Sequence, residues 1–356
     1  MTESLRRSTF MTFLPMNEKT LPDYGLISKY KTVLMGVAII FIMFCHLDIA
    51  QVHNDVPKTF LARLLHTCTV GVDIFLLLSG VGLYYSYTKH RLPYFAFEKK
   101  RVLRILPYYL LIAGVTYLLY DVLMKHYGIG VFWRDYLFIS WFRRGSTRYW
   151  YILAILVFYM LFPCIYRFIE KDKHALLKGI VFCVCWWFVI ETLSLRSETA
   201  ERFRIALSRL PVFILGVGCG KLSFERKEVS KPLLAVLLPL GYLALIVLLK
   251  IIPHPLYDYL YYPVRCLLGI SIIATVILAM EWMERTLPAL NALLWAILSW
   301  FGGLTLELYL LHQSYLILFE FPYTLLTYPS AAFCLPTMTA ALIYLYRCRR
   351  RKEKAT

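Results

Sequence analysis

Apolar residues in this chain gather in blocks of about twenty, and this spacing constrains the fold more than any other feature of the sequence. A transmembrane α-helix needs about 20 mostly apolar residues to cross the hydrocarbon core of a bilayer. Of the 356 residues, 60% are hydrophobic and 17% are charged, whereas a soluble domain has about 45–50% apolar and about 25% charged residues. A soluble domain cannot cover this much apolar surface, so the chain is expected to lie in a lipid bilayer.

Windows of about 19 residues predict ten membrane-spanning helices. They lie near residues 32–50, 70–88, 104–123, 149–168, 177–194, 207–222, 233–251, 262–282, 300–320 and 328–346. The apolar block 288–299 is too short to cross alone and is either an interfacial helix or the start of the ninth span. The expected fold is an all-α polytopic bundle, with a cytoplasmic segment 1–31, a membrane domain 32–346 and a basic cytoplasmic tail 347–356.

The connecting segments predict an orientation, because cytoplasmic loops carry an excess of Lys and Arg. If both termini are cytoplasmic, the inner segments hold 26 of the 39 Lys and Arg residues, so the expected location is the cell (plasma or inner) membrane with both termini inside. The outer connection 125–148 is also basic and is either a site for an anionic acceptor or a solvated loop. The net charge of +17 is not concentrated on a polar domain, so no nucleic-acid partner is expected.

The nine cysteines include no CxxC pair, and most lie in apolar blocks where a thiol behaves as a small hydrophobic group. No disulfide framework and no metal site are expected. The candidates for function are instead the ionisable residues inside predicted spans, because each costs about 2.5–3.5 kcal/mol to insert.

His46 is the foremost of these. It lies about fourteen residues from the inner end of the first span, which is about 21 Å into the core at about 1.5 Å per residue. Asp73 begins the antiparallel second span at a comparable depth, so its carboxylate is a candidate to orient His46 as a general base. The alternative is structural: a histidine bonded to a neighbouring helix and an aspartate that caps the second span. Position alone does not separate the two.

A second histidine, His312, lies in the ninth span about 18 Å from its inner end by the same arithmetic. Glu307 precedes it by five residues, so the two point to different sides of that helix and are expected to meet different partners. No cluster of His and carboxylate residues has the spacing of metal ligands.

The segment 96–111, AFEKKRVLRILPYYLL, carries Lys100, Arg101 and Arg104 where the third span leaves the cytoplasm. These residues either follow the positive-inside bias alone or hold the phosphates of a nucleotide-bearing donor, since guanidinium groups fork onto phosphate oxygens.

Together these pieces resemble the acyltransferase-3 type membrane acyltransferases, many of which O-acetylate bacterial surface polysaccharides. The resemblance covers about residues 30 to 320. Each stretch is weak alone, and their joint order makes the resemblance specific. The stretches are Gly36 to His46, GVDIFLLLSG at 71–80, KKRVLRILPYY at 99–109, YWYILAILVFYMLFP at 149–163 with RLPVFILG at 209–216, and LTLELYLLHQ at 304–313.

The resemblance implies transfer of an acyl group, with acetyl the first choice, from cytoplasmic acyl-CoA to a hydroxyl of a surface glycan or glycolipid such as a lipid-linked sugar. Acyl-CoA is expected as a substrate, and no tightly bound cofactor is expected. The family's essential histidine corresponds to His46, which Asp73 and Glu307 are expected to assist in catalysis. The expected substrate-binding residues are Lys100, Arg101 and Arg104 for the donor, together with Trp150, Tyr159, Arg209 and His312.

The chain departs from the family in two places. Members commonly have an Arg eleven residues before the histidine, where this chain has Met35; Lys31, one turn earlier, is a candidate replacement. The fourth-span motif also lacks the Glu of many polysaccharide acetylases, and Glu307 is the candidate substitute. A transporter or flippase with an intramembrane proton relay is the alternative function, because His and Asp inside membranes also mark such relays. Against it, no inverted repeat is visible.

Overall fold

The computed structural model describes residues 23–46, 60–145, 148–171, 174–250, 256–319 and 333–353. Within these ranges nearly every residue is helical and none belongs to a strand, which confirms the all-α prediction. The helices are α1 (Gly25–Lys29), α2 (Lys31–Cys45), α3 (Phe60–Thr67), α4 (Val70–His90), α5 (Tyr94–Tyr117) with its π-helical continuation η2 (Leu118–Met124), α6 (Ile129–Tyr136), α7 (Ile139–Arg144), α8 (Trp150–Lys171), α9 (Ala175–Ser194), α10 (Glu198–Leu207), α11 (Leu210–Phe224), α12 (Lys231–Lys250), α13 (Leu256–Thr286), α14 (Pro288–Gly303), α15 (Thr305–Leu318) and α17 (Leu335–Glu353).

Seven helical stretches in the described part of the chain are long and apolar enough to cross a bilayer, or eight if α14 and α15 form one bent span. The chain is therefore a polytopic membrane protein, but ten spans are not confirmed. The first and tenth predicted spans correspond to the shorter apolar helices Lys31–Cys45 and Leu335–Tyr346; residues 47–50 and 328–332 lie outside the described ranges.

The predicted ninth span, 300–320, is not one helix. The apolar block 288–299 belongs to α14, which ends at Gly303, and α15 starts at Thr305 after a bend of 68°. Gly302 packs its backbone against Thr32 of α2, and Leu304 leaves the helical conformation with φ −115° and ψ 19°. A close contact and a break in the backbone thus redirect the chain where hydropathy alone predicted continuity.

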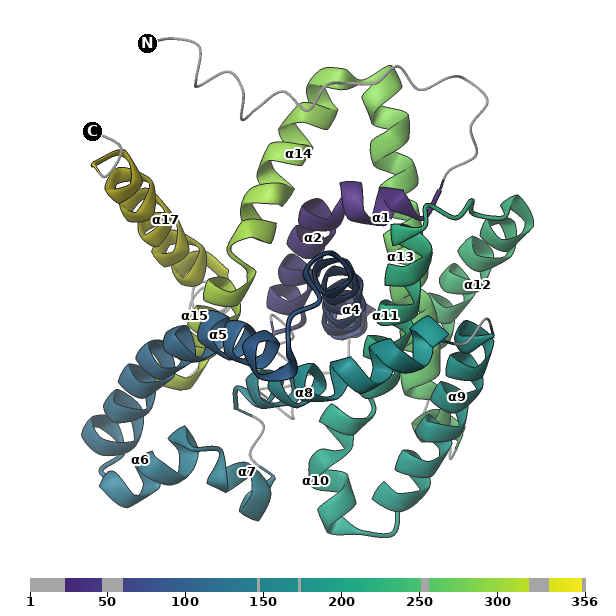
Figure 1. Ribbon diagram of the computed structural model, residues 1–356. Coiled ribbons are helices and arrows are strands. Elements are labelled where there is room, and N and C mark those ends of the chain that lie inside the picture. Colours follow the sequence, from purple (N-terminus) through teal and green to yellow (C-terminus); the bar gives the residue numbers. More distant parts are fainter. Residues whose placement is uncertain are drawn as a thin grey trace.

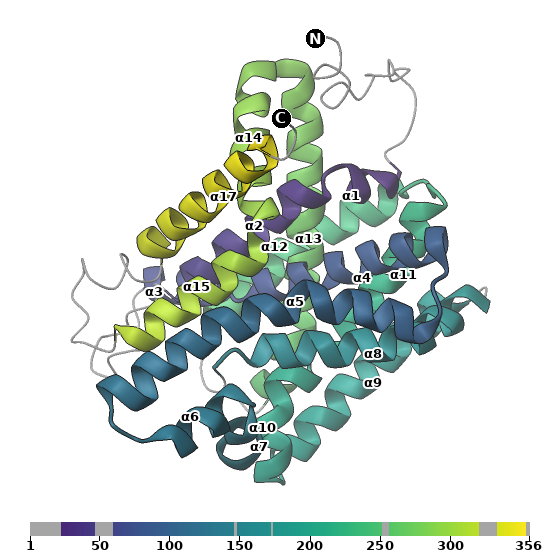
Figure 2. The ribbon, with the colours of Figure 1, turned by 60° about the vertical axis from the view of Figure 1, so that its left-hand side comes forward.

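Helix α4 lies near the centre of the molecule, seen almost end-on in Figure 1 with α2, α11 and α8 around it. Small residues allow these helices to approach closely, as is common in membranes. A Cβ at Gly80 of α4 would lie 2.7 Å from the Phe213 carbonyl oxygen of α11, and a Cβ at Gly71 would meet Phe41 and Ile42 of α2. In Figure 2, α14 stands out beyond the helices around α4.

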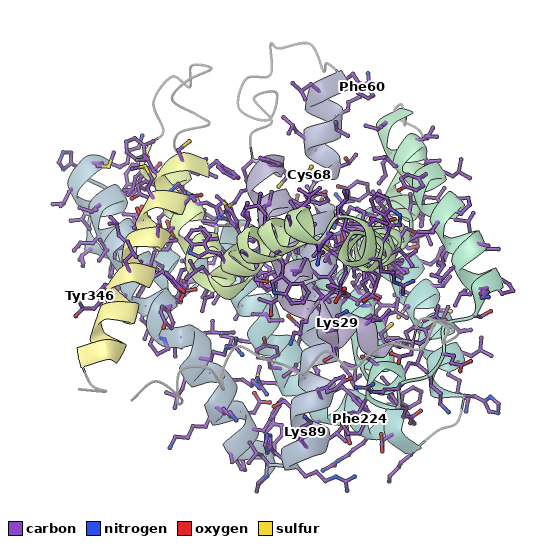
Figure 3. All side chains as sticks on the ribbon, turned by 90° about the horizontal axis from the view of Figure 1, so that it is seen from above. Lys29, Phe60, Cys68, Lys89, Phe224 and Tyr346 are labelled. Carbon is purple, nitrogen blue, oxygen red and sulfur yellow. The ribbon has the colours of Figure 1, made fainter. Side chains whose placement is uncertain are left out.

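The antiparallel helices give the molecule two distinct ends. Helix α2 begins at one end, where α4 and α11 finish, and we call this the basic end. Helix α2 finishes at the other end, where α4 begins, and we call this the histidine end. Figure 3 shows Phe60 and Cys68 toward the histidine end and Lys89 and Phe224 toward the basic end. The predicted orientation places the basic end on the cytoplasmic side.

Lys29 ties α1 to α13 at the basic end. Its Nζ lies 2.7 Å from Glu281 Oε1 and 2.8 Å from Glu284 Oε2. Partial burial favours a lower pKa for Lys29, but the hydrogen bonds to these two carboxylates outweigh burial and raise the pKa. Lys29 therefore keeps its charge at neutral pH, and the pair holds α1 in place at the start of α2.

Candidate functional site

The structure brings the two intramembrane histidines together. His46 caps the C-terminal end of α2, and His312 lies within α15. Their ring centroids are 5.0 Å apart. His312 is fully buried and His46 is half-buried, so the pair sits at the histidine end with one ring shielded and the other partly open.

Hydrogen bonds to the backbone define which nitrogen of each ring carries a proton. His46 Nδ1 lies 2.7 Å from the Ile42 carbonyl oxygen, and His312 Nδ1 lies 3.0 Å from the Leu308 carbonyl oxygen. A carbonyl only accepts hydrogen bonds, so each Nδ1 must be the donor. In the neutral rings both Nε2 atoms then have a lone pair available to accept a proton.

Gln313 connects these two lone pairs. Its amide Nε2 lies 3.2 Å from His46 Nε2 and 3.0 Å from His312 Nε2. An amide nitrogen has two hydrogens, so it can donate one to each ring. The three side chains form what we call the histidine pair and its glutamine. Gln313 was not among the predicted site residues, although a polar residue directly after His312 in an apolar run is a usable signal.

A row of three tyrosines leads away from the histidine pair. The Tyr309 ring lies 5.5 Å from the His312 ring, and Tyr151 lies 5.4 Å from Tyr309. Tyr151 and Tyr159, both on α8, reach toward the Ser79 hydroxyl of α4. We call Tyr309, Tyr151 and Tyr159 the tyrosine row.

At its far end the row meets positive charge, because Tyr159 interacts electrostatically with Arg101 and Arg104. Arg101 is buried; its Nη2 donates to Ser86 Oγ at 2.8 Å and its guanidinium lies 5.2 Å from the centre of the Phe97 ring. Among the described residues, Arg101 Nε has no hydrogen-bond acceptor. Arg104 is exposed, which leaves its guanidinium accessible.

Lys31 joins these arginines from the start of α2. Its ammonium group is close enough to repel both Arg101 and Arg104, and it occupies the space that a side chain on Gly82 would need. We call Lys31, Arg101 and Arg104 the basic cluster. Glu98 is a carboxylate that interacts with Arg101, but three cations beside one anion still leave an excess of positive charge, which favours an anionic ligand. Lys100 is exposed on α5 beside this cluster.

The site therefore has two parts at opposite ends of one helix. Lys31 begins α2 and His46 follows its last residue, so the basic cluster and the histidine pair are separated by about 22 Å along the helix at about 1.5 Å per residue. The tyrosine row lies between them. A single substrate that uses both parts must be long and thin, with its anionic groups at one end and its reacting atom at the other.

Asp73 does not lie where the sequence analysis placed it. Instead of orienting His46, its Oδ2 accepts from Arg265 Nε at 2.6 Å, and its Oδ1 lies 3.3 Å from Arg209 Nε. Asp73 therefore faces α11 and α13 rather than the histidine pair. The pairing of Asp73 with Arg265 was not predicted from the sequence.

The remaining predicted residues are more scattered. Glu307 is buried in the first turn of α15, five residues before His312 and so on a different side of that helix. Trp150 begins α8 at the histidine end, where its ring lies 6.0 Å from that of Tyr151. In the described part of the chain, no three His, Cys, Asp or Glu side chains are placed to hold a metal ion.

Comparison with known proteins identifies a family. The model of a family described as an acyltransferase domain matches residues 32–347. Neither a curated protein nor a solved structure matches the chain. The matched residues include the histidine pair, its glutamine, the tyrosine row and both arginines of the basic cluster. The match begins at Thr32, one residue after Lys31.

Proposed function

Because the chain belongs to the acyltransferase-3 family of membrane acyltransferases, we propose that it transfers an acyl group, with acetyl the first choice, from cytoplasmic acyl-CoA to a hydroxyl of a surface glycan or lipid-linked sugar. One observation carries the proposal. Two imidazoles with available Nε2 atoms lie at one end of the tyrosine row, and three cations lie at the other.

The proposed donor fits this separation. CoA carries phosphates at one end and a thioester at the end of a long, narrow arm, so its phosphates would bind Arg101 and Arg104 while the arm follows the tyrosine row toward the histidines. Arginine suits the phosphate end because its planar group donates two parallel hydrogen bonds. Lys31 would supply the charge that Met35 does not.

The proposed chemical step uses His46 as general base. The acceptor hydroxyl gives its proton to His46 Nε2 while its oxygen attacks the thioester carbonyl, so that a C–O bond forms and negative charge moves to the carbonyl oxygen. When this intermediate collapses, the C–S bond breaks and the thiolate takes the proton from His46. The products are an ester and free CoA, and the imidazole is neutral again.

Gln313 has a role in the same proposal. When an acceptor hydroxyl occupies His46 Nε2, the amide hydrogen that pointed to that nitrogen becomes available. It can then donate to the carbonyl oxygen on which charge develops, as in oxyanion holes. His312 would keep the amide in position through the second hydrogen.

The proposal is tested most directly with purified protein in liposomes, supplied with labelled acetyl-CoA and candidate glycans. Formation of labelled ester together with free CoA would support it. In cells, ester-linked acetate on surface glycans should fall when the gene is removed and return with the wild-type gene. Unchanged ester content, together with no transfer in liposomes, would contradict the proposed donor and acceptor.

Donor binding gives a first quantitative prediction. Arg104→Ala and Arg101→Ala should each weaken the apparent affinity for acyl-CoA about tenfold or more, because a charge-assisted hydrogen bond to phosphate contributes about 1.5–3 kcal/mol. The KM for acyl-CoA should rise while kcat changes little. Lys31→Ala should act in the same direction if Lys31 replaces the missing family arginine.

Lys99→Ala is the matched control, because Lys99 is an exposed cation on the same helix outside the basic cluster. It should leave the KM near the wild-type value. If Arg104→Ala inserts normally and binds acyl-CoA as well as Lys99→Ala does, the arginines only help to set the orientation in the membrane.

The orientation gives a second prediction. Lys and Arg predominate in the segments assigned to the cytoplasm, so the C-terminus should be cytoplasmic. A reporter that works only in the cytoplasm should therefore be active when it is fused after Thr356, and a reporter that works only outside should be inactive there. Paired fusions of alkaline phosphatase and a fluorescent protein measure this directly. Activity of the phosphatase at this position would place the C-terminus outside and would move the basic cluster away from cytoplasmic acyl-CoA.

A further inference from the structure

A second buried charge cluster lies on the other side of α4. It joins Asp73 in the first turn of α4, Arg209 directly before α11, and Arg265 in α13. The carboxylate lies 2.6 Å from Arg265 Nε and 3.3 Å from Arg209 Nε. All three side chains are no more than 4% exposed. We call these residues the arginine cluster.

Aromatic and hydroxyl groups hold the two guanidiniums in place. Tyr262 lies against both, with its ring centre 4.7 Å from Arg209 Cζ and 5.4 Å from Arg265 Cζ. Arg265 Nη1 also donates to Thr69 Oγ1 at 3.1 Å and to the Tyr261 hydroxyl at 3.0 Å. Because one ring contacts both arginines, their positive charges are close together.

The arginine cluster has more positive than negative charge. Two guanidiniums share one carboxylate, which leaves one positive charge in a buried place, and an uncompensated buried charge is strongly unfavourable. Arg204, which is 28% exposed, pairs with two carboxylates outside the arginine cluster, the buried Glu191 at 3.3 Å and the half-exposed Glu201 at 2.9 Å.

Each of the two guanidiniums also has buried N–H groups without an acceptor among the described residues. Arg209 Nη1 and Arg265 Nη2 are buried and have no hydrogen-bond acceptor among the described residues. Buried donors without an acceptor are costly, and charged ones more so. An excess positive charge and two unused N–H groups, both beside Tyr262, are what a bound oxyanion would neutralise and accept from.

The position of the cluster relates it to the acceptor side. Thr69 and Tyr261 are half-buried and lie near the starts of α4 and α13, so the cluster is nearest the surface at the histidine end. Helix α4 separates it from the proposed catalytic site: Phe75 contacts Tyr151 of the tyrosine row, and Asp73, two residues earlier, faces the opposite side.

We propose that the arginine cluster is a binding site for one singly charged oxyanion, a phosphodiester or a carboxylate, carried by the acyl acceptor. The acceptor is thereby an acidic or phosphate-linked molecule rather than a neutral glycan. The assignment of this anion to the acyl acceptor rests on the proposed function, whereas the anion site itself rests on two guanidiniums that share one carboxylate and on their N–H groups without an acceptor.

The test measures binding rather than turnover. The full-length protein in dodecyl maltoside is unfolded by heat at increasing concentrations of dimethyl phosphate, acetate or phosphatidylglycerol, at constant ionic strength. We expect a saturable rise in Tm with at least one probe. A response to a soluble probe indicates a group reached from water, and a response to phosphatidylglycerol alone indicates a phosphate reached from the bilayer. No saturable response to any probe would overturn the proposal.

Two substitutions should act in opposite directions. Arg209→Gln leaves the Arg265–Asp73 hydrogen bond and makes the cluster neutral, so probe affinity should fall about ten- to hundredfold, the equivalent of one charge-assisted contact. Asp73→Asn keeps the shape but removes the competing carboxylate, so affinity should rise about tenfold. Arg285→Gln, an exposed arginine, is the control and should not change affinity.

A purely structural cluster gives a different pattern. Both Arg209→Gln and Asp73→Asn would then lower Tm without changing the response to the probes, and that result would refute the anion site. If Arg209→Gln does not fold, the direction of the Asp73→Asn change still decides. Anion binding without acyl transfer would contradict the proposed function and leave the anion site standing.

Discussion

His46→Ala is expected to lower kcat by about 10²–10⁴-fold, the usual contribution of a positioned general base. A hydroxyl is a poor nucleophile unless its proton is removed as it attacks, and His46 Nε2 is available because Nδ1 donates to the Ile42 carbonyl. Insertion should be normal, since loss of a polar side chain makes a span easier to insert. Rates of CoA release and ester formation at saturating donor measure the effect.

His312 is the internal comparison, because it has the same bonding pattern and shares Gln313 with His46. We expect His312→Ala to cost less than His46→Ala, since His312 is fully buried and acts through the amide rather than on the acceptor. Gln313→Leu should lower kcat with little change in KM. If His312→Ala abolishes transfer and His46→Ala is mild, the base lies in α15.

The sequence indicated which polar side chains are buried in the bundle, among them Asp73, Glu307 and His312, but not the direction in which they point. Counting residues at a constant rise per residue gave His46 and His312 similar levels, and their rings lie 5.0 Å apart, although the count for His312 assumed a ninth span that is bent in the structure. Direction requires a polar stripe on one face, and helices that are apolar all round have none. The contact between the two histidines and the pairing of Asp73 with Arg265 could therefore not be predicted from the sequence.

The shape of the ninth span was predicted incorrectly for a related reason. Hydropathy windows assume a continuous helix, but close packing of Gly302 on α2 and the break at Leu304 divide the predicted ninth span. The basic cluster was easier to predict, because Arg101 and Arg104 lie about one turn apart on one helix. Their third member, Lys31, comes from a helix far away in sequence and was found only through the missing family arginine.

Gly216→Val is expected to prevent stable packing of α11 on α4. A Cβ at Gly216 would lie 2.8 Å from Leu77 Cα and would collide with the Leu77 carbonyl oxygen, and both are backbone atoms that cannot rotate away. Overpacking in a close-packed interior typically costs about 1–3 kcal/mol, and here the helices themselves must separate. The midpoint of unfolding in detergent should fall sharply, and Gly216→Ala should show a smaller decrease.

Gly179→Val is the matched control, because a Cβ at Gly179 meets no atom within 4 Å. It should leave the unfolding midpoint near the wild-type value, since the valine has room and gains helix propensity over glycine. The contact has a functional consequence as well: α4 carries Asp73 and α11 begins directly after Arg209, so separating the two helices must also pull this ion pair apart. Equal midpoints for Gly216→Val and Gly179→Val would show that α4 and α11 do not approach as closely as the structure indicates, and the arginine cluster would then lose its geometric basis.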